Sequence, residues 1–199
     1  MSDNLESIET IDSIKQKIQL CTLCLPELPL GVNPIMRGNV GAKILIAGQA
    51  PGIKVHQTSI PFNDLSGRRL RQWMGITDEV FYDEDKVAII PMGFCYPGKG
   101  TSGDLPPRHE CAKTWHKKLL SKFENIELIL TIGQYAQNYY LADKRKSNLT
   151  ETVKAWQEYS PKIIPLPHPS PRNNRWLKNN PWFETSVVMA LQKRVSQLL

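Results

Sequence analysis

Lys43-Ile44-Leu45-Ile46-Ala47, followed directly by Gly48-Gln49-Ala50-Pro51-Gly52, is the stretch that decides the fold of this chain. Its unbroken apolar run is typical of a strand that is buried on both faces, as the strands of parallel sheets are. The turn after it contains two glycines and a proline, which end the strand. Ligands of such sheets bind beyond the carboxyl ends of the strands. The turn at 48–52 is therefore a candidate binding loop.

Three further apolar runs predict the remaining strands, at 87–90, 126–132 and 162–166. Amphipathic stretches predict helices at 66–74, 108–123 and 133–141. A first helix ends near Cys21, and its apolar face is made of Ile8, Ile11, Ile14 and Ile18. A last helix starts after Asn180-Pro181, and its apolar stripe is Val188, Leu191, Val195 and Leu198. This alternation predicts one α/β domain over residues 1–199, with a four-stranded parallel sheet covered by helices on both faces.

The composition is that of a soluble globular protein, with 41% hydrophobic and 22% charged residues. No apolar run approaches the roughly 20 residues that span a bilayer, so we expect no membrane partner. The acidic start, Met1–Glu6, lacks the basic and apolar regions of a signal peptide. We therefore expect a cytoplasmic protein. Separately, we expect the protein to be a monomer. The net charge of +6 suits a polyanionic partner such as nucleic acid, although generic basic proteins carry a similar surplus.

Four cysteines form a C-x-x-C pair and a later, widely spaced pair: Cys21, Cys24, Cys95 and Cys111. In a reducing compartment such cysteines indicate a metal centre or catalysis rather than disulfides. Four thiolates suit either zinc or an iron–sulfur cluster, and residue types alone do not separate the two. A redox C-x-x-C usually follows a strand and opens a helix, whereas this pair follows a helix. Metal binding is therefore favoured over a redox pair or four unrelated thiols.

The last predicted strand runs into His168-Pro169-Ser170-Pro171, in which the prolines fix the backbone on either side of a hydroxyl. A neutral histidine at a strand end can donate a hydrogen bond to negative charge that develops on a leaving group. The simpler alternative is a histidine that is satisfied within its own turn. Because this loop and the turn at 48–52 both follow parallel strands, we expect them to share one cleft.

Arg172-Asn173-Asn174-Arg175-Trp176 extends the histidine loop with basic, amide and aromatic groups. Such a cluster suits phosphate contacts and stacking or wedging against bases. The alternative is a solvated turn that leads into a packed tryptophan. The turn at 48–52, in addition, offers main-chain N–H groups that can cradle a phosphate or the polar edge of a base.

Together these residues resemble the uracil-DNA glycosylase superfamily. The resemblance rests on GQAPG after the first strand, IPF about ten residues later, four cysteines in this order and HPSP after the last strand. It covers roughly residues 17–195. The closest class is the iron–sulfur one, family 4, in which two later cysteines bracket a proline-rich stretch, as Cys95 and Cys111 do here.

The resemblance implies a DNA glycosylase of base-excision repair, which flips a deaminated base out of single- or double-stranded DNA and hydrolyses its N-glycosidic bond. It implies that His168 stabilises the departing base anion and that Phe62 stacks on the base. The loop around the base and the attacking water would be Gln49, Ala50, Pro51 and Gly52. The loop that compresses the DNA backbone and fills the vacated stack would be Ser170, Arg172, Asn173, Asn174 and Arg175. The four cysteines would hold a structural [4Fe-4S] cluster, with zinc as the alternative.

Three positions depart from the pattern of this family. Pro91 stands where an asparagine usually reads the uracil edge, which leaves Asn63 or main-chain groups to replace it. Ile53–Gln57 replaces an acidic run, which leaves His56 or Asp64 as candidates to orient the attacking water. Arg172 stands where a leucine-like wedge is usual, and there it can fill the stack or grip a phosphate.

Three functions follow from these residues. The first is a DNA glycosylase that acts on uracil or another deaminated base. The second is a metal-stabilised nucleic-acid-binding protein of the same fold without glycosylase activity, because a fold does not guarantee an activity. The third is an enzyme that acts on a small nucleoside or nucleotide. Release of base from an oligonucleotide that depends on His168 indicates the first function. Salt-sensitive DNA binding without an abasic product indicates the second, and turnover of free nucleosides indicates the third.

Overall fold

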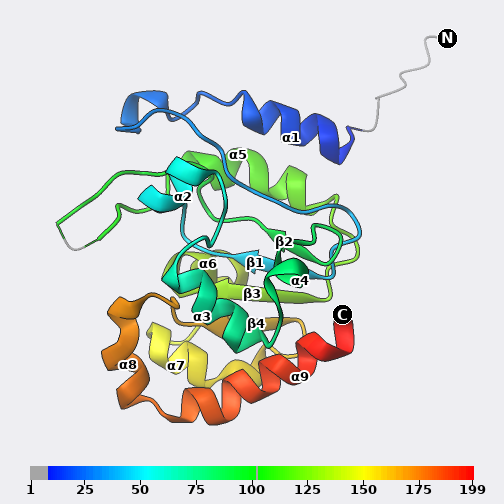
Figure 1. The fold of residues 1–199 in the computed structure, drawn as a ribbon, viewed down its shortest axis with the longest axis vertical. Coiled ribbons are helices and arrows are strands. Elements are labelled where there is room, and N and C mark those ends of the chain that lie inside the picture. The colour runs from blue at the N-terminus through cyan, green and yellow to red at the C-terminus, as the bar shows by residue number, and fades with distance from the viewer. Residues whose placement is uncertain (1–8, 102) are drawn as a thin grey trace.

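The computed structural model describes residues 9–101 and 103–199, so Ile8 of the predicted first helix lies outside the described residues (Figure 1). A four-stranded sheet lies at its centre, made of β1 (Ile44–Ala47), β2 (Val87–Ile89), β3 (Leu128–Ile132) and β4 (Ile163–Leu166). The strands lie in the order β2-β1-β3-β4 and all neighbouring pairs are parallel. The predicted α/β class and parallel sheet are confirmed.

The helices surround this sheet. They are α1 (Ile11–Gln19), α2 (Ile53–Thr58), α3 (Leu65–Met74), α4 (Asp78–Tyr82), α5 (His109–Leu120), α6 (Gly133–Leu141), α7 (Leu149–Lys154), α8 (Asn174–Asn179) and α9 (Met189–Leu198). A π-helical turn, Phe183–Val188, leads into α9. The predicted stripe of the last helix is buried, since Val188, Leu191, Val195 and Leu198 are at most 8% exposed. Four short helices, α2, α4, α7 and α8, were not expected from the sequence.

Alternate residues of each strand pack on opposite faces of the sheet, because successive side chains of a strand point to opposite sides. Ile44 and Ile46 join a core that α3, α4, α7 and α9 complete. Leu45 belongs to the core of the other face, to which α1 and α5 contribute. Figure 1 shows α1 and α5 above the sheet and α3, α7 and α9 below it. Helices therefore cover both faces, as predicted.

Within residues 9–101 and 103–199, no helix has the length and apolar character needed to cross a membrane.

A tight turn between α2 and α3 holds Phe62 with a backbone φ of 55°, in the left-handed region that side chains other than glycine rarely adopt. The turn closes because Asp64 caps α3, its Oδ1 accepting the Gly67 N–H at 2.9 Å. Gly67 permits the close approach, since a Cβ at this position would lie 1.7 Å from the Phe62 carbonyl oxygen. The Phe62 ring then packs edge-on against Phe81, with 5.9 Å between ring centroids.

We expect Gly67→Ala to destabilise the protein by at least about 1–3 kcal/mol, the usual cost of forcing an extra carbon into a packed site. The added Cβ has no room unless the Phe62 turn moves. Urea unfolding measures the change. Gly48→Ala is the matched control, because its Cβ would meet the nearest heavy atom, Phe62 Cζ, at an ordinary 3.8 Å. Equal stability of the two variants would show that the turn is not held as described.

Candidate active site

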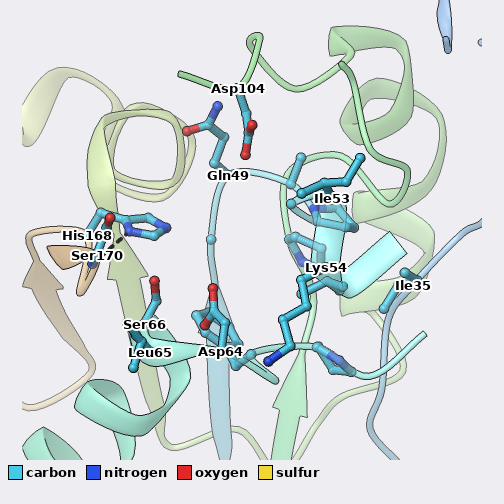
Figure 2. A pocket seen from close by; sticks show the side chains of 18 of the residues that line it. Ile35, Gln49, Ile53, Lys54, Asp64, Leu65, Ser66, Asp104, His168 and Ser170 are labelled. Atoms are coloured by element: carbon cyan, nitrogen blue, oxygen red, sulfur yellow. Dashed lines mark hydrogen bonds between the residues drawn. The ribbon is translucent and has the colours of Figure 1, made fainter. Parts of the chain in front are cut away.

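A cavity of about 560 Å³ lies at the carboxyl edge of the sheet (Figure 2). Its walls come from three strand ends: the turn 48–52 after β1, Pro91 after β2, and the loop after β4 that begins at His168. Residues 53–55 of α2, Pro61, Phe62, residues 64–66 and Asp104 also line it. The two loops that the sequence places far apart therefore share one cleft, as predicted.

Ten of the predicted catalytic, base-binding and DNA-binding residues line this cavity. They are Gln49, Ala50, Pro51, Gly52, Phe62, Asp64, His168, Ser170, Arg172 and Asn173. Four others do not line it: His56, Asn63, Asn174 and Arg175. The roles assigned to all fourteen stay predictions, but the structure brings the first ten to one place.

His56 lies on α2, where its ring packs against Tyr96 with 6.1 Å between the ring centroids. Its Nδ1 is buried, and no described residue bonds to it. Residues 53–58 form the short helix α2, which was not expected from the sequence. This helix places Ile53, Lys54 and Val55 at the cavity and His56 away from it. The structure therefore gives Asp64, not His56, a position at the cavity.

The hydrogen bonds of His168 fix its tautomer. Its Nδ1 accepts the main-chain N–H of Ser170 at 3.2 Å, so the proton of the neutral ring is carried by Nε2. Figure 2 shows the ring directed into the cavity from the β4 loop. The site thus presents a neutral N–H donor to whatever group binds opposite His168.

Burial lowers the pKa of His168 from its ordinary value of 6.5, because desolvation disfavours the charged ring. The nearby carboxylates of Asp64 and Asp104 oppose this shift, whereas Arg172 adds to it. A lowered pKa keeps the ring neutral at pH 7. It also means that the folded protein binds fewer protons here than the unfolded chain, so this group's contribution to stability is lost as the pH falls below 6.5 through the lowered pKa.

Arg69, on α3, holds the histidine loop in place. Its Nη1 donates to the carbonyl oxygens of Pro169 and Ser170, both at 3.2 Å, and its Nη2 donates to Asn174 Oδ1 at 2.8 Å. Asn173 adds a bond from its Nδ2 to the His168 carbonyl oxygen at 2.7 Å. A guanidinium suits this task because its donors form a rigid fork. The position of Nε2 is thus set by several bonds to the backbone around it.

Sequence reasoning missed Arg69, and it also missed Lys54, Ser66 and Asp104, which line the cavity. Arg69 and Ser66 belong to α3, which reads in sequence as an ordinary amphipathic helix. Asp104 lies in the stretch between Cys95 and Cys111, whose path depends on contacts far along the chain. Pro91, by contrast, directly follows a predicted strand and stands where the family resemblance expects a base-reading residue, and it does line the cavity.

The four cysteines lie together on the side of the sheet that α1 and α5 cover. All four line one small, mostly apolar cavity, with Trp115 and Phe94 among its walls. The Phe94 N–H points at Cys111 Sγ at 3.4 Å. Within the described ranges, however, no three His, Cys, Asp or Glu side chains are grouped closely enough to hold a single metal ion. The structure gathers the thiols around a cavity without arranging them about one point.

Burial raises the pKa of Cys24, Cys95 and Cys111, and that of Cys111 reaches about 12, because desolvation disfavours the thiolate. A raised pKa favours the protonated, weakly nucleophilic form of these three thiols at pH 7. They become thiolates only when a positive centre replaces the proton. Thiols that ionise when a metal binds suit a set of metal ligands.

The assignment of the His168 proton predicts a specific NMR result. We expect nitrogen-detected imidazole spectra to show the Nε2–H tautomer of His168 at pH 7, with a titration midpoint below 6.5. A His168→Gln variant identifies the signal among those of the four histidines. A proton on Nδ1 would contradict the hydrogen bond from Ser170, and a midpoint above 6.5 would contradict the desolvated, neutral ring.

Comparison with known proteins agrees with this geometry. Residues 35–192 match the profile of the uracil DNA glycosylase superfamily. The chain is also 25% identical over 170 residues to a protein named type-4 uracil-DNA glycosylase from Thermotoga maritima, across 81% of this chain and 82% of that protein. The matched region contains all four strands and every loop that lines the cavity at the sheet edge. The chain belongs to the uracil DNA glycosylase superfamily.

Proposed function

We propose that this protein hydrolyses the N-glycosidic bond between a deaminated base, uracil first among them, and deoxyribose in DNA. The superfamily and the named relative support the reaction class, which is that of a DNA glycosylase in base-excision repair. One observation carries the proposal: a neutral histidine, His168, presents a fixed Nε2–H to a cavity at the carboxyl edge of the sheet.

The cavity has the size and walls that a flipped-out base requires. Its volume of about 560 Å³ lies within the range of small-molecule sites. Phe62 offers an aromatic face at one wall, and its strained turn holds the ring without help from the ligand. A base inside a duplex cannot reach such a pocket, so the nucleotide has to leave the stack before reaction.

Catalysis rests on the stabilisation of the leaving base. As the bond from C1′ to the base breaks, negative charge develops on the ring and its carbonyl oxygens. The Nε2–H of His168 can donate to this charge, and because the ring is already oriented by Ser170 and Asn173, no reorganisation is needed at that moment. A neutral donor is sufficient, since the charge is stabilised by a hydrogen bond and not by transfer of a proton.

The cavity has no asparagine at position 91 to read the base edge, so other groups have to take this role. Pro91 has no side-chain donor, and its carbonyl oxygen lies 2.9 Å from Nε2 of His116. Asn63 does not line the cavity, and the amide nitrogens of Gln49 and Asn173 donate to carbonyl oxygens of the protein. Main-chain groups of the turn 48–52 and the Ser66 hydroxyl line the cavity and are available to contact the base. This supports a preference that extends from uracil to other deaminated bases.

Basic side chains near the cavity mouth fit a DNA backbone. Lys54 and Arg172 line the cavity and are exposed, and Arg68 and Arg175 are exposed on α3 and α8. Their charges suit phosphate contacts, whose contribution weakens with salt. Arg172 can act there as a wedge or as a phosphate ligand.

We further propose that the cysteine cavity holds a [4Fe-4S] cluster. Four thiolates also suit a zinc ion, which would bring the sulfurs to about 2.3 Å from one point. The cluster is favoured because the order of the cysteines resembles that of the iron–sulfur class. A cluster binds each thiolate to a different iron, and the finding that Cys21, Cys24, Cys95 and Cys111 all line one cavity supports these four as its ligands. The cluster would stabilise the fold here, and the chemistry at His168 needs no electron from it.

Cys95→Ser tests this cluster. We expect the purified variant to lose most of its bound iron and inorganic sulfide and to unfold at a lower temperature, because the Cys95 thiolate, one of the four proposed ligands of the cluster, is removed. Elemental analysis and thermal unfolding measure both effects. Thr22→Ser, an exposed change between the first two cysteines, is the control. Zinc in place of iron in anaerobically prepared wild type, or unchanged iron in the variant, would refute the assignment.

His168→Ala tests the glycosylase. We expect base release from an oligonucleotide with one uracil to fall about 10²- to 10³-fold, the usual loss when one anion-stabilising donor is removed. Matched single- and double-stranded oligonucleotides with uracil, hypoxanthine or xanthine measure the preference for base and strand. His109→Ala is the control, because His109 is exposed and does not line the cavity. Equal rates for wild type and His168→Ala would remove the assigned role.

One observation favours a second function, a nucleic-acid-binding protein of this fold without base release. The cavity has no asparagine after β2, where Pro91 stands. This alternative predicts salt-sensitive DNA binding and no abasic product from any of the three bases. Metal content is measured on the same preparation, so that loss of the cysteine centre is not mistaken for lack of activity.

A further inference from the structure

Asp104 lies in the segment between Cys95 and Cys111, at a turn that folds back on itself. Lys99 and Asp104 form an isolated antiparallel bridge, and the Leu105 N–H donates to the Gly98 carbonyl oxygen at 2.9 Å. The turn brings an exposed carboxylate to the cavity at the sheet edge, where no sequence pattern placed one.

Two contacts tie this turn to the walls of the cavity. The side-chain Nε2 of Gln49 donates to the Leu105 carbonyl oxygen at 2.9 Å. On the other side, Gly103 lies against Arg172, since a Cβ there would be 2.7 Å from Arg172 Nη1. The carboxylate itself lies over the β1 loop, because a Cβ on Gly52 would be 3.4 Å from Asp104 Oδ2. Asp104 is thus fixed between the β1 loop and the β4 loop.

The cavity has two carboxylates, and their surroundings differ. Asp64 is occupied as the cap of α3, with its Oδ1 bonded to the Gly67 N–H. In the part of the chain that the structure describes, no donor is bonded to the Asp104 carboxylate. Figure 2 shows Asp104 beside Gln49, at the opposite end of the cavity from Asp64, with His168 at the side. Asp104 is therefore the carboxylate with both oxygens available to a water molecule.

We propose that Asp104 is a catalytic residue, whose carboxylate orients the attacking water and accepts its proton. This inference rests on the proposed glycosylase function. The water oxygen forms a bond to C1′ of the deoxyribose, and the bond from C1′ to the base nitrogen breaks, its electron pair leaving with the base. One proton of the water passes to Asp104 and then to solvent. The base anion, held by His168, takes a proton from solvent as it departs.

The role of Gln49 follows from this arrangement. An amide at position 49 cannot accept a proton from water, but its nitrogen anchors the segment that carries Asp104. Gln49 is thus a positioning residue, and Asp104 supplies the negative charge of this part of the site. In this proposal His168 stabilises the leaving base, and Asp104 orients and deprotonates the entering water.

Asp104→Asn and Asp104→Ala test the proposal in single-turnover base release from the oligonucleotide that the wild type cleaves best. We expect the rate to fall about 10²- to 10⁴-fold, the usual contribution of a general base. Affinity for DNA with an abasic-site analogue should stay at the wild-type value, because the residue acts on water. Asp143→Asn, which removes an exposed charge between α6 and α7, should leave both quantities unchanged.

A chemical rescue separates a catalytic role from a structural one. Azide fits the space left in Asp104→Ala and attacks C1′ without giving up a proton, so it should restore release and yield a glycosyl azide. It should not rescue His168→Ala. Release at the wild-type rate by Asp104→Asn would overturn the inference, as would a loss of rate that azide does not restore and that lower DNA affinity accounts for. If the wild type itself releases no base, the proposed function fails, which is a separate result.

Discussion

All four strands run in the same direction and are buried on both faces, and this constraint determines where the rest of the molecule lies. Parallel strands need long connections, so helices follow each strand and cover the sheet. The strands end at one edge, and the loops after β1, β2 and β4 therefore meet there. Because both faces are covered, this edge is where the sheet's own loops can build a cavity.

The site at this edge is held mainly by bonds to the backbone. The proton of His168 is assigned by a main-chain N–H, and the loop that carries the ring is gripped through its carbonyl oxygens by Arg69 and Asn173. The Phe62 turn is likewise held by a bond to the backbone, from the Gly67 N–H to the Asp64 carboxylate. Such an arrangement keeps donor and aromatic wall in place before a ligand arrives, which is the condition for electrostatic stabilisation of a leaving group.

The sequence was sufficient for the sheet and for the shared cleft, because buried parallel strands read as continuous apolar runs and their end loops converge. It was not sufficient for α2, α4, α7 and α8, which are too short to show a helical period. The missed helix α2 is the reason that His56 lies beside Tyr96 and not at the cavity. Asp104 could not be foreseen either, since its position depends on contacts with Gln49 and Arg172 from distant parts of the chain.

The cysteines and the cavity are joined through one segment of chain. Cys95 and Cys111 stand at the two ends of the stretch that carries Asp104, so a centre that binds both thiols would anchor the segment at its base, while Gln49 anchors it near its tip. The order of the cysteines predicted that they lie together, and they do line one cavity. Their arrangement about a cluster depends on the bound group, which explains why residue order alone could not separate iron from zinc.

The central claim is that the cavity at the sheet edge binds a base removed from DNA, with His168 against the leaving group. A crystal structure of the protein bound to an oligonucleotide with a 2′-fluorinated uracil nucleotide tests it most directly, because the fluorine slows bond cleavage. The account predicts the uracil ring out of the stack and against Phe62, with a carbonyl oxygen in hydrogen-bond reach of His168 Nε2. A uracil that stays stacked in the DNA, or that binds away from His168, would contradict the account.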